Sequence, residues 1–324
     1  MSDKLMVVIP CYNEEEVLGE TARRLVEKMR SLVEKGLCSA ESRVLLVDDG
    51  SKDRTWEIIA ALHQENPLFE GLKLSRNRGH QNALLAGLMT ARKHCDVSIS
   101  MDADLQDDMD AMDRFLEEYR QGCDVVYGVR NKRDTDTFFK RQTALGFYRL
   151  MKALGVDITF NHADYRLMSR RALDGLAQFR EVNLFLRGLA PLVGYRSGYV
   201  FYDRNERFAG ESKYPLKKML AFAIDGITSF SVKPLRLITT LGIVIFMISV
   251  AMLLYTLITF ITGRTVIGWT STIASIWMIG GIQLLSLGVI GEYIGKIYNE
   301  SKRRPRFIID AYANAAGDAP VQDE

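Results

Sequence analysis

Two long stretches without charged residues, close to the C-terminus, constrain this chain more than any other feature. Residues 237–261 and 265–290 contain no Asp, Glu, Lys or Arg, and Arg264 is the one charged residue in the 54 positions from 237 to 290. At about 1.5 Å per residue, a helix of either length crosses a hydrocarbon core of about 30 Å. The link at 262–264 is too short for anything but a helical hairpin. We therefore predict a two-helix transmembrane hairpin rather than the buried hairpin of a soluble protein.

Basic residues at the outer ends of this hairpin predict its orientation. Lys233 and Arg236 precede the first stretch, and Lys296 and the basic cluster at 302–306 follow the second. Because positively charged flanks stay on the cytosolic side, we expect a multi-pass protein of the plasma (inner) membrane with both termini in the cytosol. The apolar run at the N-terminus is too short for a secretory signal. The predicted organisation is a cytosolic domain at 1–232, the hairpin at 233–292 and a basic cytosolic tail at 293–324.

The first 130 residues alternate short apolar runs with amphipathic helical segments. The runs lie at 5–10, 44–47, 72–74, 97–101 and 125–127. Strands and helices in alternation predict an α/β fold, with a mostly parallel sheet flanked by helices. Ligands bind such sheets at the carboxyl ends of the strands. The formal net charge of +2 excludes a strongly basic surface for nucleic acid.

Two further segments, at 137–154 and 215–236, mix Lys and Arg with large apolar residues. The same composition is found in surface helices that dock on a core and in amphipathic helices that lie among lipid headgroups. Because the second segment leads directly into the first apolar stretch, we expect interfacial amphipathic helices.

Acidic residues follow the apolar run at 97–101. Asp102 and Asp104 are separated by one residue at a predicted strand end, where two carboxylates can meet one hard cation. Mg²⁺ or Mn²⁺ accepts such oxygen ligands and keeps positions for substrate phosphates. The start of a helix is the alternative explanation, and it accounts for the later Asp107, Asp108 and Asp110 but not for the first pair.

Two other strand ends carry candidate ligands. Asp48 and Asp49 end the second run, where a carboxylate can accept from a base N–H or a ribose hydroxyl, although Asp-Gly is also common in turns. The first run ends in Pro10, Tyr12 and Glu14. The chain has no G-x-G-x-x-G after its first strand and no G-x-x-x-x-G-K-[ST], so it lacks the usual dinucleotide and P-loop phosphate sites.

Eight segments in a fixed order carry a resemblance to a known enzyme family. They read PCYNEEE, LLVDDGSKD, LSRNRGHQNALLAG, MDADLQDD, HADYRLMSRRAL, ERFAGESKY, KPLRL and GEYIGKIYNESKRRP. Together they resemble the family 2 glycosyltransferases. The most similar branch transfers a sugar from a nucleotide to a polyprenyl phosphate, and it includes bactoprenol glucosyltransferases and dolichyl-phosphate mannose synthases.

The resemblance implies a glycosyltransferase A fold, a divalent metal (Mg²⁺ or Mn²⁺) and inversion at the anomeric carbon. Asp102 and Asp104 match the motif for metal and nucleotide, and Gln106 matches a third position near the metal. Asp164 takes the place of the catalytic aspartate. The positions that match the nucleotide pocket are Pro10, Tyr12, Glu14, Asp48 and Asp49.

The resemblance also implies the substrates. The expected acceptor is undecaprenyl phosphate, and the expected donor is a UDP-sugar, with glucose ahead of N-acetylhexosamines and of GDP-mannose. The product is then a lipid-linked sugar donor for cell-envelope glycosylation, which implies a downstream flippase, and relatives suggest a homo-oligomer. His162, Ala163 and Tyr165 depart from the GDFRL of most relatives, which leaves the donor open. The alternatives are a processive polysaccharide synthase, whose QxxRW motif and additional spans are missing here, and a non-catalytic membrane partner that binds nucleotide.

The charge of the acceptor adds a physical expectation. A phosphate monoester has a second pKa of about 6, so it is nucleophilic before any proton is removed. Its approach to a diphosphate requires cations. Our candidates are Arg130, Arg141, Arg207 and Lys213, and Asp164 then orients a substrate or stabilises developing positive charge, with a general base as the alternative. His80 is given no role, because a lone histidine is more often structural.

Overall fold

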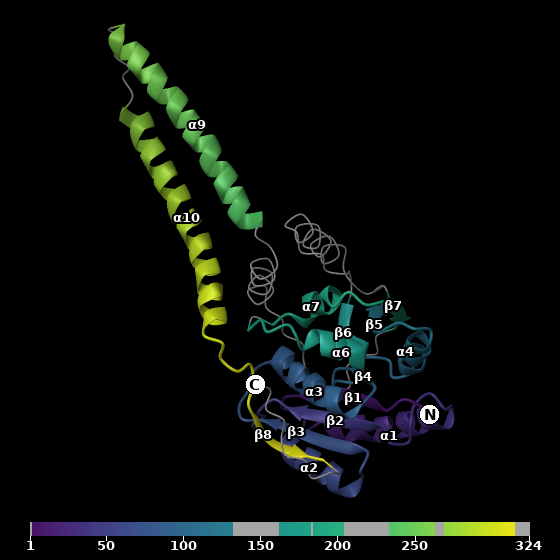
Figure 1. Ribbon diagram of the computed structural model, residues 1–324. Helices are drawn as coiled ribbons and strands as arrows, with labels where there is room; N and C mark the ends of the chain where they lie inside the picture. The colour runs from purple at the N-terminus through teal and green to yellow at the C-terminus, as the bar shows by residue number, and fades with distance from the viewer. Residues whose placement is uncertain (1, 132–161, 183, 204–232, 263–268, 315–324) are drawn as a thin grey trace. The chain divides into compact units, whose positions relative to one another are not determined.

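The computed structural model describes residues 2–131, 162–182, 184–203, 233–262 and 269–314 (Figure 1). The chain divides into two compact units. The sheet unit comprises 1–143, 158–213 and 304–324, and the helical unit comprises 144–157 and 214–303.

The sheet unit contains one eight-stranded sheet in the order β7-β5-β6-β4-β1-β2-β3-β8. All five predicted runs are confirmed as strands. The strands are β1 (Leu5–Cys11), β2 (Arg43–Asp48), β3 (Phe69–Leu74), β4 (Val97–Ser100), β5 (Val125–Arg130), β6 (His162–Ser169), β7 (Ser197–Tyr202) and β8 (Ile309–Ala313).

The sheet is mixed rather than mostly parallel throughout. Strands β4, β1, β2 and β3 are parallel neighbours, and β7 is parallel to β5. Strand β6 runs antiparallel to both β4 and β5, and β8 runs antiparallel to β3. The sequence analysis predicted neither β6 nor β7, since they lie beyond the regular alternation of runs and helices.

The C-terminal strand β8 completes the far edge of the sheet. It lies beside β3, from which it is separated by more than 230 residues, and appears as the yellow strand in Figure 1. The Tyr312 hydroxyl donates to Glu70 Oε2 at 2.7 Å, and the guanidinium of Arg306 donates to the Phe179 carbonyl at 3.2 Å. Part of the segment predicted as a basic tail therefore belongs to the sheet.

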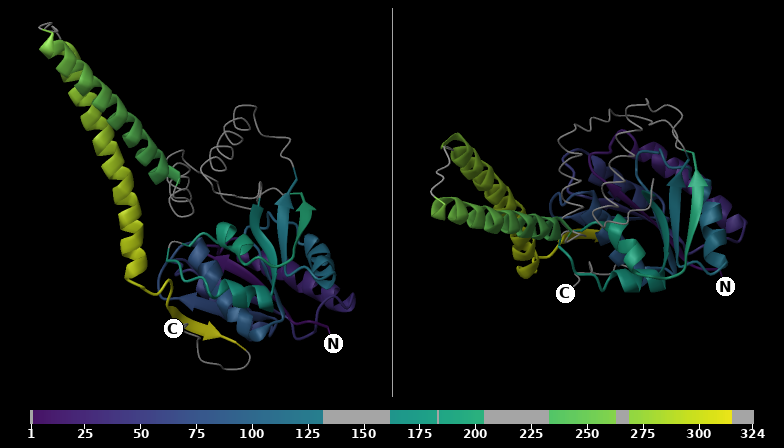
Figure 2. Two further views of the ribbon diagram at one scale, coloured as in Figure 1. Left: turned by 45° about the horizontal axis from the view of Figure 1, so that its top comes forward. Right: turned by 90° about the horizontal axis from the view of Figure 1, so that it is seen from above.

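Helices cover both faces of the sheet (Figure 2). On one face, Leu18 and Leu25 of α1 pack in the core with Val7 and Ile9 of β1. On the other, α3 packs against β1, β2 and β4, where Val8 points toward it. The helices are α1 (Leu18–Glu34), α2 (Thr55–Glu65), α3 (His80–His94), α4 (Ala111–Arg120), α6 (Arg170–Leu176) and α7 (Leu186–Leu192).

The helical unit contains two long helices, α9 (Lys233–Ile261) and α10 (Trp269–Ser301), which contact each other. Residues 237–261 and 269–290 of the two uncharged stretches are therefore confirmed as helical. Within the described residues, one segment, Met278–Ser301, is long and apolar enough to cross a membrane, with a mean hydropathy of 1.4. The predicted interfacial segment at 137–154 and residues 215–232 of the second segment lie outside the described residues.

Close packing between α3 and the sheet generates the first prediction. A Cβ at Gly87 would lie 2.4 Å from Val8 Cγ1 and 2.8 Å from Val47 Cγ2, whereas a Cβ at Gly19 of α1 meets nothing within 4 Å. We expect Gly87→Ala to destabilise the fold by about 1–3 kcal/mol through overpacking. The matched control, Gly19→Ala, should be neutral or stabilising by up to about 1 kcal/mol. Urea unfolding of the purified protein measures both, and equal midpoints for the two variants would contradict this packing.

Candidate active site

The carboxyl ends of three parallel strands meet at one edge of the sheet. The Met101 N–H donates to the Val8 carbonyl at 3.1 Å, so β4 ends beside β1. The Asp49 N–H donates to the Cys11 carbonyl at 2.9 Å, so β2 ends on the other side of β1. This register brings the candidate residues of all three strand ends to the edge where such sheets bind ligands.

Asp49 and Gly50 build the turn after β2. The Asp49 carboxylate accepts from the backbone N–H groups of Arg78 at 2.7 Å and Gly79 at 2.8 Å, which ties this turn to the loop before α3. Gly50 has φ of 65°, and a Cβ there would lie 2.5 Å from backbone atoms of residues 76–77. Asp49 is therefore committed to holding two loops together, which is a structural role the sequence did not indicate.

Asp48 offers an acceptor that the protein does not use. Its Oδ1 accepts from the Ser51 N–H at 3.1 Å, and its Oδ2 is buried with no hydrogen-bond partner among the described residues. Burial raises the pKa of Asp48. Nearby, Pro10 is buried in β1, Tyr12 is 42% exposed and Glu14 is half-buried. A buried carboxylate oxygen beside an exposed ring fits a ligand that brings N–H or hydroxyl donors.

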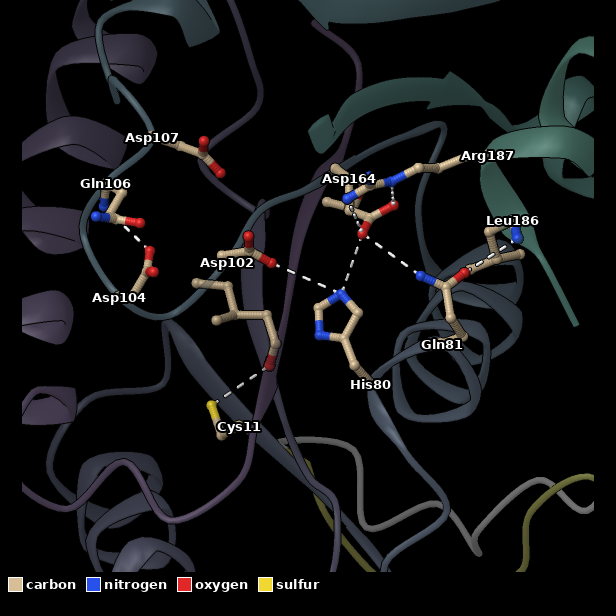
Figure 3. Close-up of polar contacts among 12 residues, drawn as sticks. Cys11, His80, Gln81, Asp102, Asp104, Gln106, Asp107, Asp164, Leu186 and Arg187 are labelled. Carbon is tan, nitrogen blue, oxygen red and sulfur yellow. Dashed lines mark hydrogen bonds and ion pairs between the residues drawn. The ribbon is translucent and has the colours of Figure 1, made fainter. Parts of the chain in front are cut away.

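The loop after β4 presents the acidic residues (Figure 3). Asp104 Oδ1 accepts from the Gln106 N–H at 3.2 Å, and the buried Leu105 between them has φ of 59°. A left-handed conformation is uncommon for a residue with a Cβ, so the loop holds this shape against local preference. Burial, together with repulsion from Asp107, Asp164 and Asp104, raises the pKa of Asp102 to about 6 although His80 opposes it.

The side-chain oxygens of this loop are of the chemical type that binds a divalent cation. Among the described residues no three His, Cys, Asp or Glu side chains are grouped to hold a metal, so a site here depends on Asp102, Asp104 and the amide of Gln106. Mg²⁺ is commonly held by one or two carboxylates, with waters and substrate phosphates as its other ligands. A cation bound here would offset the burial and the repulsion between carboxylates that raise the pKa of Asp102.

Asp164 is the most heavily bonded carboxylate of the site. Its Oδ1 accepts from Arg187 Nε at 3.1 Å and from Arg166 Nη2 at 3.3 Å. Its Oδ2 accepts from Arg187 Nη2 at 3.0 Å and from Gln81 Nε2 at 3.4 Å. Burial opposes the charge of Asp164, but its bonds to His80 and the two arginines hold the pKa of the carboxyl well below its usual range. This group is ionised whenever the protein is folded near neutral pH.

His80 lies between the two carboxylates of the site (Figure 3). Its Nε2 is 3.4 Å from Asp164 Oδ2 and 3.7 Å from Asp102 Oδ1, and 42% of its side chain is exposed. Burial favours the neutral ring, but Asp164 and Asp102 outweigh it and raise the pKa of His80. The sequence analysis gave this residue no role, and the structure places it at the centre of the site.

Arg130 is anchored at the end of β5. Its Nη2 donates to Asp107 Oδ1 and its Nε donates to the Tyr202 hydroxyl, each at 3.2 Å. The Tyr202 hydroxyl donates in turn to the same Asp107 oxygen at 2.6 Å. Asp107, which had been explained as part of a helix start, is buried and orients this arginine.

The structure thus assembles most of the candidate residues and adds others. Arg141, Arg207 and Lys213 lie outside the described residues. Three side chains around Asp164 were missed by the sequence analysis: Gln81, Arg166 and Arg187. Arg166 is two positions from Asp164, a spacing that places both on one face of a strand, whereas nothing local to Arg187 distinguishes it.

Comparison with known families places this chain among glycosyltransferases. The family described as "Glycosyl transferase family 2" matches residues 6–176, and the family described as "GtrB C-terminal hairpin" matches residues 233–297. The first includes every strand from β1 to β6 and all the acidic residues discussed here.

Individual relatives are similar over nearly the whole chain. The glycosyltransferase YkoT of Bacillus subtilis is 55% identical over 94% of this chain and 91% of its own length. A prophage bactoprenol glucosyl transferase homolog of Escherichia coli is 40% identical over 94% of this chain and 98% of its own. Among solved structures, the mannosyltransferase PcManGT of Pyrobaculum calidifontis has a TM-score of 0.45 and 16% identity, covering 92% of this chain and 85% of that one.

Proposed function

Because this chain belongs to the family 2 glycosyltransferases and is an enzyme, we propose that it transfers a sugar from a nucleotide sugar to a polyprenyl phosphate. UDP-glucose is the first choice of donor and undecaprenyl phosphate of acceptor, with inversion at the anomeric carbon. The relatives named for bactoprenol glucosyl transfer support this choice. The reaction takes place on the cytosolic face of the membrane and gives a lipid-linked sugar.

The observation that carries the proposal is the division of the site into an acidic half and a basic half. Asp102, Asp104 and Asp107 form the acidic half, and Arg166, Arg187 and His80 surround Asp164 in the basic half. A transfer between a diphosphate and a phosphate brings several negative charges together, and these need cations on both sides. The basic half supplies cations of its own, and the acidic half would supply one by binding a divalent metal ion.

In the proposed reaction a phosphate oxygen of the acceptor forms a bond to the anomeric carbon. The bond from that carbon to the β-phosphate oxygen of the donor breaks, and the nucleoside diphosphate leaves with the electron pair. The acceptor is already ionised near pH 7, so no protein group has to take a proton from it. Asp164, held by two arginines, orients groups rather than accepting a proton.

The acidic half is the proposed place of a divalent cation, Mg²⁺ or Mn²⁺. Asp102, Asp104 and Gln106 would hold it, and it would supply positive charge to offset the donor diphosphate. Asp48 with its unused oxygen, together with Pro10, Tyr12 and Glu14, is proposed to bind the nucleoside.

We further propose that α9 and α10 form a transmembrane hairpin. Large apolar side chains are exposed along both helices, among them Leu237, Met247 and Ile258 in α9 and Met278 and Leu284 in α10. Helices that expose such residues without packing them into a protein core are stable in lipid.

The first functional prediction concerns the metal. Asp104→Asn removes an anionic oxygen ligand, so transfer from UDP-glucose to undecaprenyl phosphate should fall by roughly a hundredfold or more. The matched control is Asp110→Asn in the same loop, whose side chain is 89% exposed and which should keep its activity. Radiolabel transfer to lipid, with purified protein and a panel of donors, measures both. Full activity of Asp104→Asn, or of the wild type in excess chelator, would contradict the metal site, and a wild type that transfers no sugar would contradict the function.

The second functional prediction distinguishes an orienting role of Asp164 from a role as general base. Asp164→Asn should lose roughly a hundredfold in transfer at every pH from about 6 to 9, since the acceptor is ionised above its pKa of about 6. Calorimetry should find that the variant still binds UDP-glucose, and Asp174→Asn, at an exposed position in α6, serves as control. Recovery of the transfer activity of Asp164→Asn at high pH would instead indicate that Asp164 acts as a general base.

A third prediction concerns orientation. Protease added to sealed, right-side-out vesicles should spare both termini and reach at most the loop around Arg264, because the basic flanks hold the other segments in the cytosol. The same protease should degrade the sheet unit after the vesicles are permeabilised. Cleavage of the sheet unit in sealed vesicles would contradict the orientation.

A further inference from the structure

The beginning of α7 is fixed to the site from two sides. The Leu186 N–H donates to Gln81 Oε1 at 3.0 Å (Figure 3). The Leu186 carbonyl accepts from Arg166 Nη1 at 3.0 Å. The Leu186 side chain is completely buried. Both anchoring groups also donate to Asp164. The position of the next residue, Arg187, is therefore set by the same network that holds the carboxylate.

Of the two arginines bonded to Asp164, Arg187 is the one whose side chain is partly exposed to solvent. Its Nε and Nη2 form a bidentate pair with the two Asp164 oxygens, at 3.1 and 3.0 Å. Its side chain is 34% exposed, compared with 3% for Arg166 and 6% for Asp164. A guanidinium has five N–H donors, and Asp164 uses one edge of it. The Nη1 of Arg187 makes no hydrogen bond to any of the described residues.

The charges around Arg187 favour an anionic ligand. Asp164 carries one negative charge, and the guanidinium groups of both Arg166 and Arg187 pair with it. Burial would lower the pKa of Arg187, but Asp164 and, more weakly, Asp102 raise it, while Arg130 acts in the opposite direction. Two guanidinium groups therefore share one carboxylate, which leaves net positive charge beside the exposed edge of Arg187.

We propose that Arg187 is a substrate-binding residue whose exposed edge binds a phosphate group, and that Asp164 is the residue that positions it. The ligand is a phosphate oxygen of either the donor diphosphate or the acceptor monoester, and the proposal rests on the proposed function for these substrates. A planar guanidinium held rigidly on one edge loses little further freedom when its other edge binds phosphate. This role accounts for the many hydrogen bonds that Asp164 accepts, because a carboxylate that serves as a proton acceptor would not have its oxygens occupied by other donors.

The test measures binding in the full-length protein, without turnover. Wild type, Arg187→Gln and Arg187→Lys are titrated by calorimetry with UDP in the presence of Mn²⁺, and separately with a short-chain polyprenyl phosphate and the uncharged polyprenol of equal length. We expect Arg187→Gln to weaken binding of one phosphate ligand by roughly tenfold or more, as for the loss of a charge-assisted hydrogen bond. Affinity for the polyprenol should not change. The affinity of Arg187→Lys for that ligand should lie between those of the wild type and Arg187→Gln, because lysine keeps the charge but lacks the planar guanidinium.

The matched control is Arg92→Gln, at the opposite end of α3 from His80. Arg92 is 26% exposed and pairs with Asp174, so it resembles Arg187 in exposure but lies away from the site. Weaker UDP binding assigns Arg187 to the donor, and weaker polyprenyl phosphate binding assigns it to the acceptor. Unchanged affinity of Arg187→Gln for both phosphates, at an unfolding midpoint equal to that of the wild type, would overturn the proposal. If Arg187→Gln does not fold, unchanged affinity of Arg187→Lys for both phosphates would overturn the proposal instead. A wild type that binds these ligands but transfers no sugar contradicts the proposed function and leaves this inference standing.

Discussion

The buried carboxylate of Asp164 is the interaction on which the rest of the site depends. An ionised carboxylate withdrawn from water is costly unless it is paired, and here two arginines, a histidine and an amide share it. These partners come from α3, β6 and α7, so pairing this one charge fixes three elements relative to one another. The same pairing explains why α7, a helix of only seven residues, begins at a defined point.

The acidic half of the site differs from the basic half in how its carboxylates are held. The loop after β4 carries Asp102, Asp104 and Asp107, and burial together with repulsion between carboxylates raises the pKa of Asp102. A left-handed Leu105 and the bond from the Gln106 N–H to Asp104 hold the loop in an uncommon backbone shape. Backbone strain and shifted pKa values are commonly found at functional sites, where ligand binding offsets their energetic cost. In a glycosyltransferase with a GT-A-like fold, the sheet supplies the rigid edge on which both halves are placed.

Much of the fold was predictable because burial imposes period and length. The short apolar runs at 5–10, 44–47 and 97–101 are strands between helices, as predicted, and the uncharged residues 237–261 and 269–290 are helices, as predicted. Strands β6 and β7 were missed because they lie beyond the regular alternation of runs and helices, and β8 was missed because its partner lies far away in the sequence. Strand β8 forms only because β3 offers an unpaired edge, and no pattern within 309–313 indicates that edge.

The sequence by itself determined the acidic motif and the family, and its resemblance to that family predicted the candidate roles of Asp48, Asp49 and Asp164. Only the tertiary structure decided what these residues do to one another. It placed His80 between Asp102 and Asp164, turned Asp107 inward to orient Arg130, and brought Arg187 onto Asp164 from 23 positions away. The physical reason is that electrostatic interactions depend on distance and burial in space, and an arginine without a local pattern acquires its role only when the chain folds around its partner.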